Sequence, residues 1–596
     1  MKRAYHKLLM AACLLSLVSF NACQDSYLDV EPKGNLNETA LATKAGVNGL
    51  LIGAYSLLDG VGGPGTFFLT GVANAIVGSM AADDSHKGGT YGAQQDINLI
   101  ENHSLDPSNG IINEKWRVYY AGIQRANDAL RVLEKVPAGE LTEQEITQIR
   151  AEAVFIRAVQ HLEAAKMWRN IPYLDETVSF ASNNYYVDNT TPVWPKIEAD
   201  LNYAAGKLTP TKSEVGRANS WAAKAFLAKA YMFQRKFTEA KPLLKDLIDN
   251  GVTASGRKYA LVALFANTWL ASAKNSSESV FAVQSSVNDG AVGYNGNAGE
   301  ALNTPTIRNG GTNQPSFSLV NSFKTDSITG LPLLETFNDT DMKHDLGLTV
   351  NEPFTPYAGT VDPRLDHTVG RRGIPYLDWG LHGRQWIIAQ NEGGPFSAKK
   401  TWFNKADLAK YSELIDGWAD ATANNYTMIR FADVLLWAAE VEVEIGSLAE
   451  AERLVNLVRA RAANREGWVK TYVDNNEPSK GFTNTPAANY KIGLYTGQFT
   501  AKGKEFARES VRFERKLELA MEGHRFFDLQ RYDNGTGYMA DVLNAYIKHE
   551  TTTYDYQILK GARFIKGKHE LYPIPLAQID LSMQNGQATL KQNPNY

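Results

Sequence analysis

Two stretches of the chain have the pattern of antiparallel helix pairs, and this repeated plan constrains the fold more than any other feature. In the first, apolar residues recur at helical spacing over 221–233 and again over 237–248. In the second, a helical run over 428–445 ends at Gly446 and a further run follows over 448–462. The lengths of the runs and the tight turns between them predict one kind of helical hairpin that recurs along the chain.

Further amphipathic helices are predicted over about 37–58, 113–136 and 142–168. Thr142 is followed three residues later by Glu145, which is the signature of a capping box at a helix start. The helical hairpins resemble tetratricopeptide units, in which pairs of helices stack side by side. The predicted fold class is therefore mainly α, with a tetratricopeptide-like scaffold of helix pairs and an irregular, loop-rich aromatic part.

The irregular part is a long stretch, about 255–427, that is rich in glycine, asparagine, proline and aromatic residues and lacks sustained helical periodicity. Long loops in a compact protein are usually functional or disordered, and the many aromatic residues argue against disorder. We expect an irregular ligand-binding subdomain over 255–427, between an N-terminal helical part over 37–254 and a C-terminal helical part over 428–596.

The N-terminus has the features of an export signal. Basic residues precede an apolar run over 8–20 that is too short to cross a bilayer as a helix. Ala22, a small residue, stands directly before Cys23, as at the cleavage site of a bacterial lipoprotein, although Phe20 stands where leucine is usual. We predict a lipoprotein signal peptide over 1–22 and acylation of Cys23. The alternative is an ordinary secretory signal with an incidental cysteine.

Cysteine usage and charge exclude several classes of function. The chain has two cysteines, and Cys13 would leave with the signal peptide, so the mature chain has no disulfide and no free thiol once Cys23 is acylated. Residues 23–36 are predicted to form a polar, acidic tether, which resembles the surface-export signals of Bacteroidetes lipoproteins. The formal net charge of −4 supplies no basic field for a polyanion, so nucleic acid is not an expected partner.

Several sequence blocks, in a fixed order, resemble the SusD/RagB family of glycan-capturing lipoproteins. The blocks lie at 149–158, 193–201, 362–365, 429–436, 456–461, 514–531 and 571–575. The resemblance implies an α-helical fold with four tetratricopeptide-like helix pairs. It also implies a glycan ligand, lipid anchoring at the cell surface of the outer membrane, and a seat over a SusC-like TonB-dependent transporter as partner. The RagB branch leaves a peptide ligand as an alternative.

Charged residues in these blocks have a structural interpretation that needs no ligand. They occur at helical spacing, at which they can pair with each other or with the backbone. The residues concerned are Arg430, Asp433, Glu514, Arg515, Glu518 and Glu522. We expect them to be structural.

A sugar site needs flat aromatic side chains for stacking and polar side chains for hydrogen bonds, and two stretches supply both. The first is a polar stretch between helical runs that contains Asp83, Asp84, Lys87 and Tyr91. The alternative is a solvated loop in which Asp83 only caps or turns the chain. We predict Tyr91 as a stacking residue and the other three as hydrogen-bonding residues.

The second stretch runs over 370–386 and contains Arg372, Tyr376, Trp379 and Trp386. A single tryptophan is more often part of a core than of a ligand platform. The glycine and proline neighbours nevertheless favour loops in which a ring is harder to bury. We predict stacking by Tyr376, Trp379 and Trp386 and hydrogen bonding by Arg372.

The main rival function is a secreted glycoside hydrolase with Asp83 and Asp84 as its acids. Adjacent carboxyls on one short loop cannot readily face each other across a glycosidic bond, at the ~5 to 10 Å that this chemistry needs. The sequence also lacks the zinc-protease, serine-hydrolase and phosphate-loop motifs. The Gly-x-Gly-x-x-Gly match over 60–65 follows a helical run and contains Pro64, so it is interpreted as accidental. We predict no catalysis and no cofactor, and a structural calcium ion stays open.

Overall fold

The computed structural model describes residues 38–61, 67–291, 295–308, 311–415 and 419–596. The predicted signal peptide over 1–22 and the predicted tether over 23–36, with Cys23, lie outside the described residues. No helix in the described ranges is long and apolar enough to cross a membrane.

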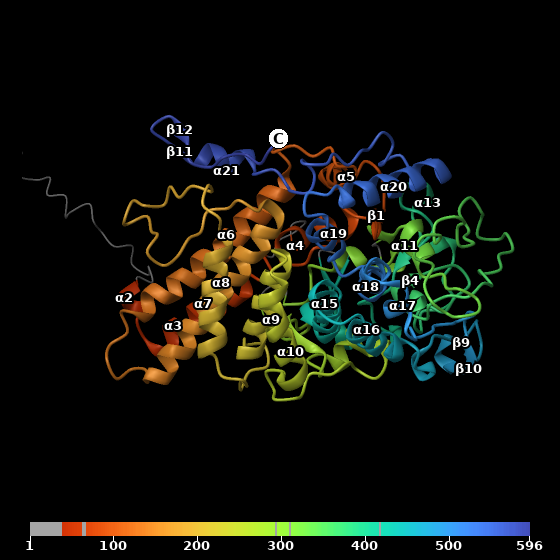
Figure 1. Cartoon of the computed structure of the whole chain (residues 1–596), viewed down its shortest axis with the longest axis horizontal. Helices are drawn as coiled ribbons and strands as arrows, with labels where there is room; N and C mark the ends of the chain where they lie inside the picture. The colour runs from red at the N-terminus through yellow and green to blue at the C-terminus, as the bar shows by residue number, and fades with distance from the viewer. Residues whose placement is uncertain (1–37, 62–66, 292–294, 309–310, 416–418) are drawn as a thin grey trace, which may run out of the picture.

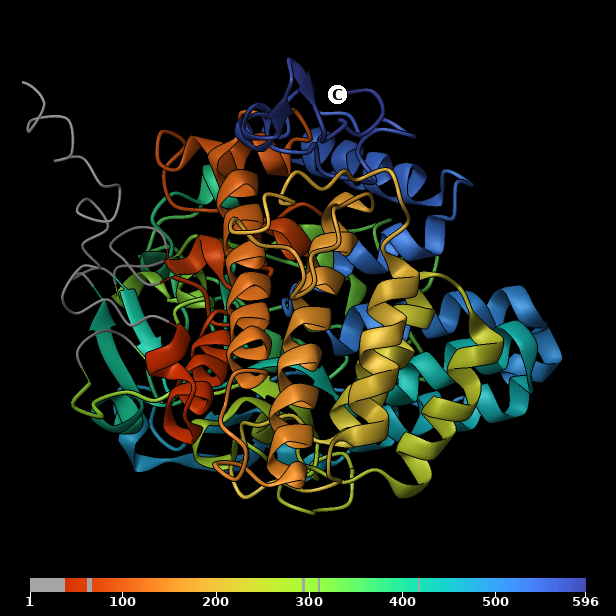
Figure 2. The same ribbon diagram turned by 90° about the vertical axis from the view of Figure 1, so that its left-hand side faces the viewer.

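A row of stacked helices forms one side of the molecule (Figures 1 and 2). In chain order these are α3 (Lys44–Ser56), α6 (Gly110–Leu133), α7 (Glu143–Trp168), α8 (Trp194–Lys207), α9 (Ser220–Phe233), α10 (Phe237–Asn250), α15 (Phe431–Ile445) and α16 (Leu448–Ala462). They pack as the pairs α3/α6, α7/α8, α9/α10 and α15/α16, and each pair contacts the next. The predicted mainly α fold with tetratricopeptide-like helix pairs is thus confirmed, and the two predicted hairpins are α9/α10 and α15/α16.

Local capping sets the helix starts. At the start of α7, the Glu145 amide donates to Thr142 Oγ1 at 3.2 Å and the Thr142 amide donates to the Glu145 carboxylate at 2.9 Å, which confirms the capping box. The single helix predicted over 37–58 is wrong. There are two helices, α2 (Glu38–Leu41) and α3, because Thr43 takes an extended conformation and accepts the Gly46 amide as a new N-cap.

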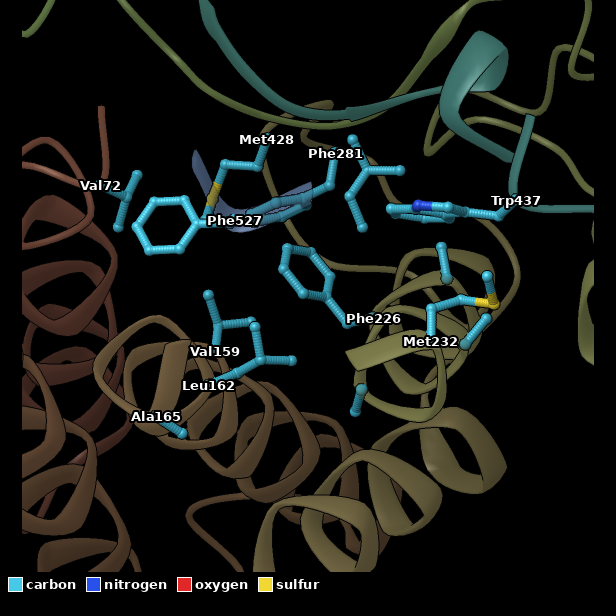
Figure 3. Packing of buried hydrophobic residues seen from close by; sticks show 14 of the residues in the cluster. Val72, Val159, Leu162, Ala165, Phe226, Met232, Phe281, Met428, Trp437 and Phe527 are labelled. Atoms are coloured by element: carbon cyan, nitrogen blue, oxygen red, sulfur yellow. The ribbon is translucent and has the colours of Figure 1, made fainter. Parts of the chain in front are cut away.

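The core lies where the helix row meets the rest of the chain (Figure 3). Phe155 of α7 packs edge-to-face on Phe226 of α9 and on Phe281, with ring centroids 5.4 and 5.1 Å apart. Phe281 belongs to β2 (Ser279–Val283), which pairs antiparallel with β8 (Tyr426–Arg430). This two-stranded sheet ties both ends of the irregular stretch to the helix row, so one hydrophobic core serves both parts.

Within 255–427, the longest described helix has six residues. Its elements, with their pairing partners elsewhere, include β1 (Ser85–Lys87) with β3 (Asn313–Pro315), α11 (Phe317–Ser322), α12 (Leu365–Thr368), β4 (Val369–Gly370) with β5 (Ser397–Ala398), η8 (Arg384–Trp386), α13 (Gln390–Gly393), α14 (Leu408–Tyr411) and β6 (Ser412–Ile415) with β7 (Ala419–Thr422). The predicted domain boundaries stay a prediction.

The C-terminal part adds further helices, of which α20 contacts α11 of the irregular stretch and α21 contacts α6 of the helix row (Figure 1). They are α17 (Gln498–Lys502), α18 (Lys504–Glu518), α19 (Arg525–Asp533), α20 (Tyr538–Thr553) and α21 (Leu576–Leu581). The same part contains two strand pairs, β9 (Lys470–Tyr472) with β10 (Phe482–Pro486) and β11 (Met583–Gln584) with β12 (Gln587–Ala588).

Buried ion pairs around α18 join the two parts of the molecule. Glu514 lies 2.7 Å from Arg364 and 2.8 Å from Arg459, while Glu518 contacts Arg364 at 3.0 Å and Arg430 at 2.5 Å. All five side chains are buried. Arg364 comes from the irregular stretch, Arg430 from the end of β8 and Arg459 from α16. The structural interpretation of the charged blocks is confirmed.

We expect Glu518→Gln to destabilise the protein strongly, because it removes a buried charge that neutralises Arg364, Arg430 and Arg461. Removing one partner of a buried ion pair costs about 3 to 5 kcal/mol of unfolding free energy. The matched control is Glu505→Gln, whose side chain is 82% exposed beside Arg508. Urea denaturation followed by circular dichroism should show a much lower urea midpoint for Glu518→Gln and a nearly unchanged midpoint for Glu505→Gln. Equal midpoints for the two variants would contradict a structural network.

Candidate functional site

A cleft with a volume of about 740 Å³ lies among three segments of the chain. One wall is the loop 346–350, a second is formed by η8 and α13 with Gly394, and the third is the segment 554–556 that follows α20. This volume is in the range of ligand clefts in proteins.

The floor of the cleft is aromatic. The rings of Phe317 and Tyr554 lie parallel, with centroids 3.4 Å apart and planes 10° apart, and His344 packs edge-on against Phe317. The Tyr554 hydroxyl lies 3.1 Å from the His344 ring. Tyr556 also lines the cleft, and its hydroxyl donates to Glu101 at 3.0 Å. These contacts fix the rings in place before any ligand arrives.

The rim of the cleft is polar. Asn391 and Asp555 are exposed, and Arg384 is half-buried and donates to the Ile387 carbonyl at 2.8 Å. Thr349 adds a hydroxyl on the opposite loop. An apolar aromatic floor with scattered hydrogen-bonding groups suits a sugar, whose ring faces carry C–H groups and whose edges carry hydroxyls.

The expected exposed loop is wrong for Asp83 and Asp84, because both side chains are buried, although Asp83 lines a second cleft that is described below. Their contact with a ligand stays a prediction. Asp83 is buried between Lys516, at 2.8 Å, and Arg525, at 2.6 Å. Burial alone would raise the pKa of Asp83, but the charges of Arg525 and Lys516 outweigh it and hold that pKa well below its usual range. The Asp83 carboxylate is therefore ionised and fully engaged inside the protein.

Asp84 is also buried, and its Oδ2 accepts the backbone amide of Met521 at 3.1 Å. Burial and the neighbouring charge of Asp83 raise the pKa of Asp84 to about 7. Such a shift can mark a catalytic acid, but here the physical causes are burial and the adjacent carboxylate. The two acids connect the start of β1 to the α18–α19 region.

Lys87 is buried as well, and its Nζ donates to the Thr90 carbonyl at 2.6 Å, so it is not presented to solvent as a ligand group. Burial lowers the pKa of Lys87. Tyr91, four residues on, is 49% exposed and is the one predicted member of the first stretch that reaches the surface. Its proposed contact with ligand stays a prediction.

The second predicted stretch folds into a small core of its own. Tyr376 and Trp386 are buried with Trp402 and Phe403, and half-buried Trp379 donates its indole N–H to the Phe403 carbonyl at 2.9 Å. The expectation that Tyr376 and Trp386 are exposed is wrong. Glycine and proline put these rings on loops, but the loops fold back on each other and bury them.

Arg372 supports the cleft from behind. Its guanidinium donates to the carbonyls of Thr349, Val350 and Glu352 at 3.1, 3.0 and 2.6 Å. The carbonyls of Thr349 and Val350 belong to the exposed loop that forms one wall of the cleft, and Glu352 lies just after it in the sequence. Arg372 therefore holds the wall in place, and the N–H groups that bind these carbonyls are not available to a ligand.

The first predicted stretch borders the cleft, and the second contributes Arg384 to its lining. β1, with Lys87, contacts α13, and the Tyr556 hydroxyl lies 3.4 Å from the Lys87 carbonyl. Sequence reasoning thus found the supports of the cleft and missed its lining. Tyr554, Asp555 and Tyr556 do form an aromatic–acid–aromatic pattern in the sequence, but it stands at the end of a helical run where no loop is expected.

A second cleft, of about 610 Å³, lies between α18, α20 and the segment 334–339. Its charges are largely neutralised by one another. Arg512 pairs with Glu509 at 2.9 Å and lies 4.5 Å from each of the Tyr532 and Tyr538 rings. Among the described residues, no group of three or more histidine, cysteine or acidic side chains is placed to hold a metal ion.

Comparison with known proteins identifies the family. The family model described as "SusD family" matches residues 273–596, which is more than half of the chain, and a model described as "Starch-binding associating with outer membrane" matches residues 26–232. The chain belongs to the SusD family. The sequence resemblance to this family is thereby confirmed.

Individual relatives agree over almost the whole length. "SusD-like protein P2" of Formosa agariphila is 25% identical over 549 residues, which covers 89% of this chain and 91% of that relative. Among solved structures, a SusD superfamily protein of Bacteroides vulgatus has a TM-score of 0.64 at 19% identity, covering 93% of this chain and 99% of its own. Surface glycan-binding protein A of Bacteroides thetaiotaomicron, solved with laminarihexaose, has a TM-score of 0.58 at 18% identity, covering 93% and 100%.

Because Asp83 neutralises two buried cations, we expect Asp83→Asn to lower the unfolding free energy by about 3 kcal/mol. The matched control is Asp555→Asn on the exposed rim of the cleft, which should leave the urea midpoint nearly unchanged. Equilibrium denaturation of both variants makes the comparison. A stable Asp83→Asn variant would show that Asp83 has no structural role.

The buried His86 predicts a loss of stability at alkaline pH. Burial would lower its pKa, but hydrogen bonds to Glu101, at 2.9 Å, and Glu550, at 3.0 Å, raise it to about 9. The folded state then binds more protons than the unfolded state between the ordinary histidine pKa, ~6.5, and about 9. The unfolding free energy should therefore fall as pH rises through this window.

Urea denaturation at several pH values measures this slope, and His86→Gln should flatten it. His549 also has a pKa raised to about 9, where hydrogen bonds to Asp341 and Glu550 outweigh burial. The contribution of His86 is therefore the difference between the wild-type and His86→Gln slopes of unfolding free energy against pH. Identical slopes in the two proteins would rule out the charged histidine.

Proposed function

We propose that this protein is a non-catalytic cell-surface binding protein that captures an oligo- or polysaccharide and delivers it to a SusC-like TonB-dependent transporter. The observation that carries the proposal is the 740 Å³ cleft, with its stacked Phe317 and Tyr554 floor and its polar rim. Tyr91, exposed on the loop after β1, is a further contact for the glycan in this proposal.

The relatives support a glycan ligand and an outer-membrane location. One fold neighbour is a surface glycan-binding protein solved with laminarihexaose, and another is a laminarin-binding SusD-like protein. The description of the family model for residues 26–232 names starch binding and association with the outer membrane. In our proposal Cys23 carries the lipid that anchors the mature chain, and residues 23–36 form its tether.

The lining of the cleft supports binding without hydrolysis. Asp555 is the one carboxylate among its described lining residues, whereas a glycosidase places two carboxyls on either side of the bond that it cleaves. Asp83 is ionised and held by two cations, so it is unsuited to act as a proton donor. Asp84 is buried against the backbone of Met521.

A site of this kind is expected to bind weakly. A Kd of ~1 mM corresponds to only about −4 kcal/mol, so the loss of one or two contacts can abolish detectable binding. The rim residues are the better targets for mutation, because Phe317 and Tyr554 are buried and their removal would disturb the core. Two rim residues have matched controls elsewhere on the surface.

The test is affinity electrophoresis of the mature chain without Cys23 against a panel of polysaccharides, with an assay for released reducing ends. We expect retardation on one glycan, loss of retardation in Asn391→Ala and in Arg384→Ala, and no new reducing ends. The controls Asn484→Ala and Arg453→Ala change exposed residues away from the cleft and should migrate like wild type. Released reducing ends would overturn the non-catalytic proposal, and binding to peptides with no glycan retarded would overturn the glycan proposal.

A further inference from the structure

An exposed aromatic cluster stands on the loop between α7 and α8, far from the cleft. Phe180 is 80% exposed, the highest value for an aromatic side chain among the described residues, and Tyr185 is 37% exposed. The Phe180 and Tyr185 ring centroids are 4.7 Å apart, and Tyr185 and Tyr186 are 4.5 Å apart. We call these three residues the aromatic tip. Covering an exposed phenylalanine removes apolar surface from water, so a partner surface would stabilise the aromatic tip.

The loop that carries the aromatic tip is held by its own hydrogen bonds. Asn184 accepts the Ser179 amide at 2.9 Å and donates to the Thr177 carbonyl at 2.9 Å. Asp175 accepts the Thr177 amide at 3.0 Å. The aromatic tip is therefore presented on a preformed loop and need not be ordered by its partner, which reduces the entropic cost of contact.

The aromatic tip lies close to the point where the chain leads to Cys23. Arg131 of α6 donates to the carbonyls of Glu176 and Val178 at 3.2 and 3.3 Å, and its Nε lies 3.9 Å from the carboxylate of Glu38. Glu38 is the first described residue of the chain. One arginine thus contacts both the base of the loop and the first described residue of the chain, and Figure 1 shows α2 and this loop at the same end of the molecule.

The length of the intervening chain keeps this end of the molecule near any anchor at Cys23. Fourteen residues lie between Cys23 and Glu38, so the two residues are at most ~50 Å apart when this segment is fully extended. The cleft lies elsewhere, because α13 and α20 are at the opposite end in Figure 1. Of the two ends, the one with the aromatic tip is held closer to the lipid.

We propose that the aromatic tip rests on the lipid surface, with the Phe180 ring in the interfacial layer and the tyrosine hydroxyls at the level of the headgroups. Aromatic rings with a polar edge are favoured at membrane–water interfaces. The contact is weak by itself, but the tether raises its effective concentration. The inference rests on the proposed anchoring at Cys23.

The test holds the protein on vesicles without depending on acylation. In the mature chain a hexahistidine replaces Cys23 and binds phosphatidylcholine vesicles that contain a nickel-chelating lipid. No other cysteine remains, so Ala181→Cys gives a single site for an environment-sensitive fluorophore beside the aromatic tip. Thr485→Cys, on exposed β10, gives the matched control label.

We expect the emission at 181 to shift to the blue on vesicles and to be quenched by lipids with spin-labelled acyl chains, whereas the label at 485 stays aqueous. The triple change Phe180→Ser, Tyr185→Ser and Tyr186→Ser should abolish the shift while vesicle binding through the hexahistidine persists. The proposal would be overturned if the label at 181 had the same emission in water and on vesicles, as expected for the label at 485. A blue shift that persists in the triple variant would also overturn it.

The glycan assay separates this inference from the proposed function. The triple variant should be retarded by glycan like wild type, since the cleft is intact. Loss of retardation in the triple variant would make the aromatic tip a glycan platform and overturn the lipid contact. Absence of glycan binding in wild type would instead count against the proposed function, while the vesicle result would still decide the role of the aromatic tip.

Discussion

The structure depends on one buried set of charges, the carboxylates of Glu514 and Glu518 on α18 with the arginines around them. These arginines come from the irregular stretch, from β8 and from the helix row. Separation of any of these parts would leave a charge in the protein interior without its partner, which costs far more than an exposed ion pair contributes. The network therefore fixes how the irregular stretch sits on the scaffold more strictly than hydrophobic contacts alone would.

The same helix also connects this network to the candidate site. Lys516 of α18 holds Asp83 at 2.8 Å, directly before β1, and β1 contacts α13 at the wall of the cleft. Arg372 orders the facing loop through three backbone carbonyls. The polar residues that sequence reasoning assigned to the ligand are thus the buried supports of a preformed cleft, which keeps the Phe317 and Tyr554 floor rigid.

Sequence reasoning succeeded where the controlling interactions are local. The α7 start at Thr142 and the hairpins α9/α10 and α15/α16 follow from capping and from apolar spacing along a few turns. It failed for Asp83, Tyr376 and Trp386, because each is buried by segments far away in the sequence. Asp83 pairs with Arg525, which lies 442 residues later in the sequence, and no sequence pattern around position 83 predicts that partner.

The sequence by itself determined the mainly helical scaffold of stacked pairs and the membership of the SusD family, since helix periodicity and ordered sequence blocks are properties of the chain alone. Only the tertiary structure decided which polar and aromatic side chains face solvent. Loops of similar composition can fold back into a core, as around Trp386, or stand out in water, as at Phe180. Their burial depends on what the rest of the chain packs against them, and that is settled by long-range contacts.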